Sequence, residues 1–399
     1  MRITVLALAA LLAGCSAPAA PEPAPAPSTG GPRIVGYFTD WSGYGRNFQV
    51  RDVDTSGAAA DLTHLVYAFG KVQDGSCRPG DTWADYDRPV TAAASVDGLA
   101  DRAGQGLRGN FGQLRKLKAR HPGLRVLWSF GGWTGSAGFA AAAREPEAFA
   151  ASCARLLHDP RWAGLFDGID IDWEYPNACG LACDTSGPDA LPGLVTALRR
   201  ALGPDAVISA AVPGDVGKLG ATDYADVAAQ ADWVSAMTYD FFGTGDTSGP
   251  TAPHSPLTAY PGIPRATATT DAAIRKLRDL GIPAGKIVLG VGFYGRGWTG
   301  VRSATPGAAA TGAARGTYEQ GLEDYGVLSR TCPPTGTIGG TAYAFCHGQW
   351  WSYDTPQTLK AKMAYARSAG LAGAFAWELS GDTADAQLVK AMRAGLTPP

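Results

Sequence analysis

Short runs of β-branched and aromatic residues alternate with longer segments of helical periodicity along most of the chain. Such alternation is typical of βα units built around a parallel sheet. The eight runs that we interpret as strands are Ile34–Phe38, Thr63–Phe69, Val126–Phe130, Gly168–Trp173, Val207–Val212, Trp233–Tyr239, Ile287–Phe293 and Gly373–Trp377. The helical segments between them include Phe111–Ala119, Pro146–Leu157, Leu191–Leu202, Thr270–Leu280 and Thr358–Ala369. Eight units favour the α/β class and a closed (β/α)8 TIM barrel, whose active site would lie at the carboxyl ends of the strands.

One interval between predicted strands is too long for a simple connection. From Tyr294 to about Gln357 the chain is rich in Gly, Thr and Tyr and contains two cysteines. A structureless loop of this length is uncommon in a compact domain. We therefore expect a small inserted subdomain, at about residues 298–356 between the seventh and eighth strands, that forms one wall of a groove.

The amino-terminal residues have the pattern of an export signal. Arg2 precedes an apolar run, Ile3–Leu12, that is too short to cross a bilayer as a helix. The next residues, Ala13-Gly14-Cys15, complete a segment that resembles a bacterial lipobox, in which Cys15 becomes lipidated after cleavage. An ordinary cleaved signal with an incidental Cys15 is the alternative. We predict a lipoprotein signal over residues 1–15 and an exported protein that is anchored to the membrane rather than spanning it.

The residues after the signal divide into a spacer and a folded domain. Residues 16–32 consist almost entirely of Ala, Pro, Ser, Thr and Gly, and their prolines favour an extended, semi-stiff linker. Residues 33–396 remain for the barrel domain, a length within the usual range of about 200 to over 400 residues. The formal net charge of −2 argues against a basic nucleic-acid surface. We expect a monomer that binds no nucleic acid.

Six cysteines follow the linker, at Cys77, Cys153, Cys179, Cys183, Cys332 and Cys346. An even number in an exported chain indicates disulfides, although fifteen pairings are possible. Loop length favours Cys179 with Cys183 and Cys332 with Cys346, which leaves Cys77 with Cys153. A zinc site is the alternative, but no histidine lies at ligand spacing from these cysteines. The five histidines form no ligand or nucleophile motif, so we expect no metal and no cofactor.

The strongest chemical signal is the segment Phe-Asp-Gly-Ile-Asp-Ile-Asp-Trp-Glu-Tyr, residues 166–175. Side chains alternate between the two faces of a strand, so Asp170, Asp172 and Glu174 are predicted to point the same way. Neighbouring buried carboxyl groups resist joint ionisation, which suits an enzyme that keeps one carboxylic acid protonated near neutral pH. An acidic face on an exposed edge strand and a site for a hard cation are the alternatives.

This segment resembles the D-G-x-D-x-D-x-E signature of glycoside hydrolase family 18, the chitinase family, without a mismatch. Residues 129–133, Ser-Phe-Gly-Gly-Trp, resemble the family's third-strand motif, and residues 237–240, Met-Thr-Tyr-Asp, resemble its sixth-strand motif. Trp377 lies where the family has a tryptophan on strand eight, and Tyr37 fits the end of strand one. The resemblance covers about residues 33–395. It implies that the insertion is the α+β subdomain of the deep-groove bacterial chitinases.

The resemblance also implies catalytic roles, because this family uses the substrate's own acetamido group as nucleophile. Glu174 would protonate the glycosidic oxygen and later deprotonate the attacking water. Asp172 would hydrogen-bond the acetamido N–H, and Asp170 would share a proton with Asp172. Tyr239 would hold the acetamido carbonyl oxygen. Met237 and Asp240 would shape the same pocket.

Asp167 begins the signature but has an odd offset from Asp170, so regular strand geometry excludes it from the inward face. We expect a structural or proton-network role for Asp167 rather than direct contact with substrate.

A groove that binds sugar polymers needs aromatic surfaces, because sugar rings present apolar C–H faces. The candidate substrate-binding residues at or after the strand ends are Tyr37, Trp133, Tyr294, Arg296, Trp298 and Trp377. Ordinary loop packing is the alternative for Trp133 and Trp298, since aromatic residues fill cores as readily as grooves. Trp83, Trp350 and Trp351 are weaker candidates for the same reason.

The function that the sequence predicts is hydrolysis of β-1,4-linked N-acetylglucosamine in chitin and chito-oligosaccharides. One alternative is an endo-β-N-acetylglucosaminidase that acts on N-glycans. Another is a non-catalytic chitin-binding lectin, although such relatives typically lack the glutamate that is present here as Glu174. We see no separate carbohydrate-binding module after Pro32, and we therefore expect weaker action on crystalline than on soluble chitin.

Overall fold

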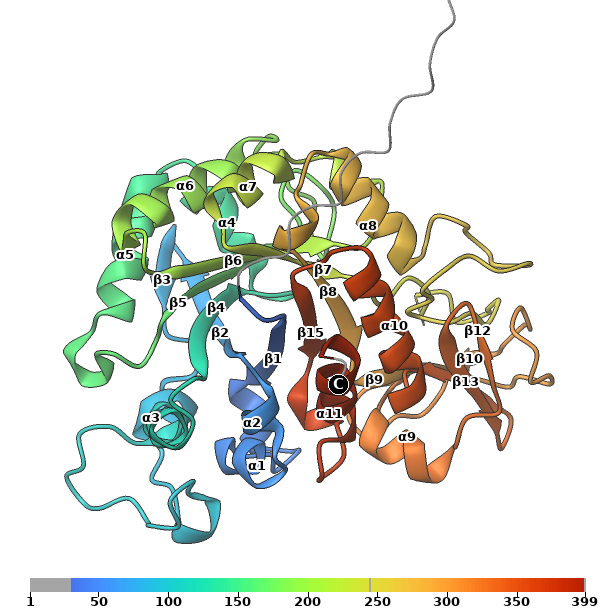
Figure 1. Cartoon of the computed structure of the whole chain (residues 1–399), viewed down its shortest axis with the longest axis horizontal. Coiled ribbons are helices and arrows are strands. Elements are labelled where there is room, and N and C mark those ends of the chain that lie inside the picture. The colour runs from blue at the N-terminus through green and yellow to red at the C-terminus, as the bar shows by residue number, and fades with distance from the viewer. Residues whose placement is uncertain (1–29, 244, 398–399) are drawn as a thin grey trace, which may run out of the picture.

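The computed structural model describes residues 30–243 and 245–397, in which eight parallel strands form a closed barrel (Figure 1). The strands follow one another around the barrel in chain order, and β1 closes it by pairing with both β2 and β15. The barrel strands are β1 (Arg33–Thr39), β2 (His64–Gln73), β4 (Arg125–Gly131), β5 (Gly168–Asp172), β6 (Val207–Pro213), β7 (Trp233–Met237), β8 (Ile287–Gly292) and β15 (Gly373–Trp377). All eight coincide with predicted runs, and the predicted fold class is confirmed.

Helices cover the outside of the barrel (Figure 1). They are α1 (Val50–Thr55), α2 (Ala58–Asp61), α3 (Gly109–Arg120), α4 (Phe139–Ala142), α5 (Pro146–Leu157), α6 (Ala190–Leu202), α7 (Tyr224–Gln230), α8 (Thr270–Asp279), α10 (Pro356–Ser368) and α11 (Gln387–Leu396). The five helical segments named from sequence correspond to α3, α5, α6, α8 and α10. Two of these helices begin with a proline, which has no N–H to leave unpaired in the first turn.

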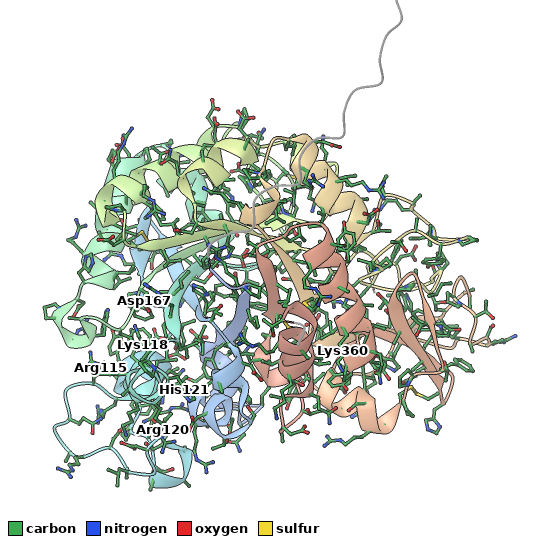
Figure 2. All side chains as sticks on the ribbon, in the orientation of Figure 1. Arg115, Lys118, Arg120, His121, Asp167 and Lys360 are labelled. Atoms are coloured by element: carbon green, nitrogen blue, oxygen red, sulfur yellow. A yellow bond between two sulfur atoms is a disulfide. The ribbon has the colours of Figure 1, made fainter. Side chains whose placement is uncertain are left out.

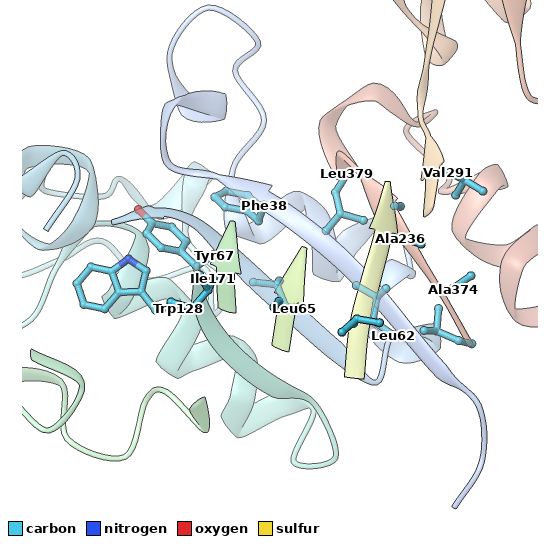
Figure 3. Packing of buried hydrophobic residues seen from close by; sticks show 14 of the residues in the cluster. Phe38, Leu62, Leu65, Tyr67, Trp128, Ile171, Ala236, Val291, Ala374 and Leu379 are labelled. Atoms are coloured by element: carbon cyan, nitrogen blue, oxygen red, sulfur yellow. The ribbon is translucent and has the colours of Figure 1, made fainter. Parts of the chain in front are cut away.

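The hydrophobic core has two layers, because alternate residues of each strand face opposite sides of the sheet. In β5, Ile169 and Ile171 are buried against the helices, as predicted, and so are Phe38 of β1 and Trp128 of β4 (Figure 3). The residues that alternate with these along each strand fill the inside of the barrel, as Val35 does in β1. The polar side chains of β5 therefore point into the barrel, where they must find polar partners.

The insertion follows β8 directly and is built around a second, antiparallel sheet (Figure 1). Its strands are β9 (Tyr294–Thr299), β10 (Gly312–Ala313), β11 (Leu322–Asp324), β12 (Gly336–Ile338), β13 (Thr341–Cys346) and β14 (Gln349–Tyr353). One helix, α9 (Tyr325–Thr331), follows β11. The α+β character that the family resemblance implied is therefore present, while the exact limits of the subdomain stay a prediction.

Arg46, in the loop after β1, connects the insertion to the barrel. Its guanidinium pairs with Asp324 of β11 and lies 3.7 Å from the carboxylate of Glu378, which directly follows β15. It also lies 4.3 Å from the ring centroid of Tyr318, whose hydroxyl donates to the carbonyl of Gly45 at 3.4 Å. The two segments thus meet above the end of β15.

A second set of contacts holds the other side of the insertion. The Lys362 ammonium of α10 lies 2.5 Å from Asp354 Oδ2 and 2.6 Å from the carbonyl oxygen of Ser255, and both charged side chains are buried. The backbone N–H of His254 donates to the Ser352 hydroxyl of β14 at 3.1 Å. The insertion is therefore attached to the barrel on two sides.

Three disulfides join Cys77 with Cys153, Cys179 with Cys183, and Cys332 with Cys346. Loop length had favoured the last two pairs, and the first was the pair left by elimination. The first connects β3 (Ser76–Arg78), which extends the edge of β2, to α5. The predicted signal with Cys15 and nearly all of the predicted linker lie outside the described residues. Within 30–243 and 245–397, no helix has both the length and the apolar character needed to cross a bilayer.

Candidate active site

Asp170 lies fully buried inside the barrel and is the centre of a hydroxyl cluster. Its carboxylate accepts hydrogen bonds from Ser129 at 2.6 Å, Ser209 at 2.6 Å and Tyr37 at 2.9 Å. The parallel register places Ser129 and Ser209 beside Asp170 on the neighbouring strands. Burial raises the pKa of Asp170, and the three donors oppose that rise by favouring the carboxylate.

Asp172 and Glu174 follow Asp170 at the carboxyl end of β5. The strand ends at Asp172, one residue before the predicted end at Trp173. Glu174 therefore lies just beyond the strand. Burial, together with the nearby Glu174 and Asp170, raises the pKa of Asp172 well above its usual range. One oxygen of Asp172, Oδ1, is buried without a hydrogen-bond partner. Burial also raises the pKa of Glu174 to about 7.

The backbone at Glu174 is held by the loop after β4. The N–H of Glu174 donates to the Ser136 hydroxyl at 2.8 Å, and that hydroxyl donates to the carbonyl of Gly132 at 2.9 Å. Gly131 has a φ of 111°, and a Cβ at this position would lie 2.2 Å from the carbonyl oxygen of Asp172. The paired glycines of the predicted third-strand motif thus allow two backbones to approach closely.

Tyr175 and Lys218 surround the Glu174 carboxyl group. Tyr175 hydrogen-bonds Glu174 and Lys218 lies nearby, and both favour the carboxylate and so limit the rise in its pKa. The Lys218 ammonium also lies 4.1 Å from the centroid of the Tyr175 ring. Neither residue was among the predicted site residues, although Tyr175 ends the acidic segment of residues 166–175. Nothing in the local sequence of Lys218 marks it as a site residue.

The end of β7 contributes a second side of the site. The strand ends at Met237, which is 9% exposed, and Tyr239 follows it. The Tyr239 ring lies 6.3 Å from that of Tyr294 and 5.9 Å from that of Phe375. Burial raises the pKa of Tyr239 well above its usual range, and the electrostatic effects of Tyr294, Asp172, Tyr37 and Glu174 add to the rise.

Asp240 is fixed by an arginine and a histidine. Arg296 of β9 binds its carboxylate through two hydrogen bonds, at 2.8 and 2.7 Å. Nδ1 of the buried His254 lies 3.6 Å from Asp240 Oδ1. Burial alone would raise the pKa of Asp240, but Arg296 and His254 lower it well below the usual range. Arg296 was predicted to contact substrate, and in the structure its fork is directed at Asp240.

Trp377 is the last residue of β15. It is partly buried, and its ring contacts Tyr37 edge-on at 5.5 Å and stacks against Phe69 at 5.6 Å between centroids. Tyr37 is only 2% exposed, and its hydroxyl donates to Asp170. Phe69 was not predicted, and its place within a predicted strand gave no sign of it.

The remaining predicted aromatic residues differ in exposure. Trp133 is 49% exposed and can present its ring to a ligand. Trp298 is 1% exposed, packs against Trp350 at 5.8 Å, and donates from Nε1 to the carbonyl of Asp246. Trp298 therefore fits the alternative of ordinary packing rather than exposure in a groove. Trp41, which was not predicted, is 43% exposed beside Phe69.

Asp167 lies apart from these groups, on the outside of the barrel with Lys118 of α3 (Figure 2). Its carboxylate accepts hydrogen bonds from the Lys118 ammonium at 2.7 Å and from the backbone N–H of Val126 at 2.7 Å. Of the two roles expected for Asp167, structural or in a proton network, these contacts agree with the structural one. Among residues 30–243 and 245–397, no cluster of three His, Cys, Asp or Glu side chains is arranged to hold a metal ion.

Comparison with known proteins identifies the family of this chain. Residues 33–382 match glycosyl hydrolases family 18. The chain is 57% identical over 363 residues to Chitinase C of Streptomyces lividans, covering 90% of this chain and 59% of that protein. It is 55% identical over 376 residues to Chitinase 63 of Streptomyces plicatus, covering 93% of this chain and 62% of that one. The chain thus spans about three fifths of the length of these relatives.

A solved structure gives the same result for the fold. The catalytic domain of psychrophilic chitinase B from Arthrobacter TAD20 superposes with a TM-score of 0.87 and 35% sequence identity. The superposition covers 92% of this chain and 95% of that domain.

Proposed function

This chain belongs to glycosyl hydrolases family 18, and on that premise we propose that it is a chitinase. It hydrolyses the β-1,4 linkages of chitin and chito-oligosaccharides with retention of configuration, using the substrate's acetamido group as nucleophile. The observation that carries the proposal is the carboxyl pair Asp172 and Glu174 at the end of β5, in which burial keeps a proton near neutral pH.

Glu174 is the general acid and base. A carboxyl group with a pKa of about 7 is partly protonated at neutral pH, so it can donate a proton to the glycosidic oxygen and then accept one from water. The hydrogen bond from its N–H to Ser136 holds the backbone from which this carboxyl group extends.

Asp172 and Tyr239 orient the acetamido group. The unpartnered Oδ1 of Asp172 supplies a buried acceptor for the acetamido N–H, and the Tyr239 hydroxyl supplies a donor for the acetamido carbonyl. Asp170 shares a proton with Asp172 and tunes it, and its charge adds to the rise that burial and Glu174 cause in the pKa of Asp172. Together these contacts place the carbonyl oxygen for attack on C1 and balance the positive charge that develops.

Residues on either side of this centre bind the sugar chain. Trp377 supports the sugar at the cleavage site, and the exposed ring of Trp133 offers a second apolar surface. Met237, Asp240 and Tyr294 border the acetamido pocket, Tyr37 supports its floor, and Arg296 keeps Asp240 in place.

We further propose that the protein is exported as a monomer and anchored by a lipid on Cys15. The lipobox-like Ala13-Gly14-Cys15 and the oxidised cysteine pairs support this location. Cys15→Ser should release the protein from the membrane fraction, and unchanged fractionation would exclude Cys15 as the anchor.

Product analysis on the N-acetylglucosamine hexamer, with wild type and Glu174→Gln, tests the proposed activity. The variant keeps the shape of Glu174 and removes its transferable proton, and such catalysis contributes about 10²–10⁴-fold. We expect cleavage to short oligomers by the wild type and a loss of at least about 10²-fold in the variant. Intact hexamer with both proteins would favour the N-glycan or lectin alternatives, and equal cleavage by both would show that Glu174 is not the acid.

A further inference from the structure

A pocket of about 570 Å³ adjoins the candidate active site at Asp240 and Arg296. It lies between the loop that follows β7 and the insertion. Its other lining residues include Phe242, Asp246, Trp298 and Glu319. None of the proposed catalytic steps uses this pocket, although a sugar chain bound at Tyr239 and Asp240 would continue into it.

The charges that line this pocket are unequal. Three acidic residues, Asp240, Asp246 and Glu319, and one arginine, Arg296, line it. The Asp246 carboxylate accepts hydrogen bonds from the N–H and the hydroxyl of Ser248, which carry no charge to neutralise it. Arg296 directs its two short hydrogen bonds at Asp240 and lies 3.7 Å from Glu319, whose side chain is 65% exposed. Once Asp240 and Arg296 neutralise each other, Asp246 and Glu319 leave the pocket negative.

The pocket also has the apolar surface and fixed walls of a sugar site. Phe242 is partly buried, which leaves part of its ring accessible on the pocket wall. Trp298 Nε1 donates to the carbonyl oxygen of Asp246 at 2.9 Å and so holds that loop against the insertion. Another cation beside this loop, Arg265, lies over the Phe242 ring at 5.8 Å, donates to the Phe241 carbonyl and lies 3.9 Å from the carboxylate of Asp215. Its charge is therefore already paired with that of Asp215.

We propose that this pocket selects a sugar residue with a free amine, so that the preferred substrate is partly N-deacetylated chitin. This rests on the proposed chitinase function. The sugar that is cut must keep its acetamido group, since that group is the nucleophile. A glucosamine residue in the neighbouring pocket carries an ammonium that Glu319 and Asp246 attract, whereas the amide of an acetylated sugar is uncharged.

Competitive digestion of N-acetylglucosamine hexamers tests this preference. The mixture contains the fully acetylated hexamer and hexamers with a single glucosamine at each known position, and mass spectrometry follows each one. With wild type, glucosamine at one fixed distance from the cut should raise kcat/KM about two- to fivefold, the range of an exposed ion pair. Glu319→Gln should lower this ratio towards one, since only Asp246 then attracts the ammonium, and Glu319→Lys should lower it further.

Glu147 provides the matched control, because its side chain is also 65% exposed and also lies beside an arginine, Arg200. It belongs to α5 on the outside of the barrel, so Glu147→Gln and Glu147→Lys should leave the ratio at the wild-type value. An unchanged ratio in both Glu319 variants, or an equal fall in the Glu147 variants, would overturn the proposal.

Failure of the proposed chitinase function would be seen separately, as an intact fully acetylated hexamer. In that case, the affinities of the same hexamers for the Glu174→Gln variant, measured by calorimetry, would still show whether the pocket prefers glucosamine. Equal affinity for the acetylated and glucosamine-containing hexamers would refute it.

Discussion

Glu174 determines how the activity should depend on pH. Its pKa of about 7 means that the general acid loses its proton as the pH rises through neutrality. We therefore expect kcat/KM on the acetylated hexamer to fall on the alkaline side with an apparent pKa of about 7, because kcat/KM reports the free enzyme. The residues that contact the carboxyl group decide where this limb lies.

Tyr175→Phe is the perturbation that should move this limb. The Tyr175 hydroxyl hydrogen-bonds Glu174 and favours its carboxylate, so removing the hydroxyl raises the pKa of Glu174. A hydrogen bond to a charged group contributes about 1.5–3 kcal/mol, and about 1.4 kcal/mol corresponds to one pKa unit. Water can replace part of this bond at the partly exposed Glu174, so we expect an upward shift of about half to one unit.

The assay is kcat/KM for hexamer cleavage across the neutral and alkaline range. Tyr365→Phe is the matched control, since the Tyr365 hydroxyl donates to the carboxylate of Asp271 at 3.0 Å on the outer helices. The alkaline limb of the pH profile of Tyr365→Phe should coincide with that of the wild type. An alkaline limb that stays in place or moves to lower pH in Tyr175→Phe would refute the assignment of this limb to Glu174.

Two further substitutions test how the fold supports the site. Lys362→Met should destabilise the protein by about 3–5 kcal/mol in urea unfolding, because it leaves Asp354 as a buried, unpaired charge, whereas Lys116→Met at a surface pair should cost under about 1 kcal/mol. A loss as small as that of the control would contradict this. Ser136→Ala leaves the N–H of Glu174 unpaired at a cost of about 1–3 kcal/mol, so kcat should fall about tenfold with little change in KM. An unaltered kcat would mean that Ser136 does not position the acid.

Periodicity predicted the barrel because each strand buries both of its faces and leaves a distinct run of apolar residues. The same alternation correctly placed Asp170 and Asp172 inside the barrel and Asp167 outside it. Local pattern could not predict contacts between residues far apart in sequence. Ser136 reaches Glu174 across 38 positions, and His254 reaches Asp240 because two loops fold together.

The solvent exposure of individual tryptophan side chains was the other property that the sequence could not predict. A tryptophan beyond a strand can face a groove or fill the packing beneath it, and nothing in its neighbours distinguishes the two. Trp133 and Trp298 had the same alternatives, and one is half exposed while the other is buried against Trp350. The difference arises from the second sheet, whose strand pairing places Trp298 opposite Trp350.

The attachment of the insertion on two sides has a consequence for binding. Arg46 holds it to the end of β15, and Lys362 with Asp354 holds it to α10, so the wall is pre-organised before any ligand arrives. The conformational entropy of placing the wall is lost during folding, and little more is lost when a sugar chain binds. The affinity for a sugar chain should then depend on how well it fits beside this fixed wall. A branched or heavily substituted polymer should be excluded by its shape, because the wall does not move to accommodate it.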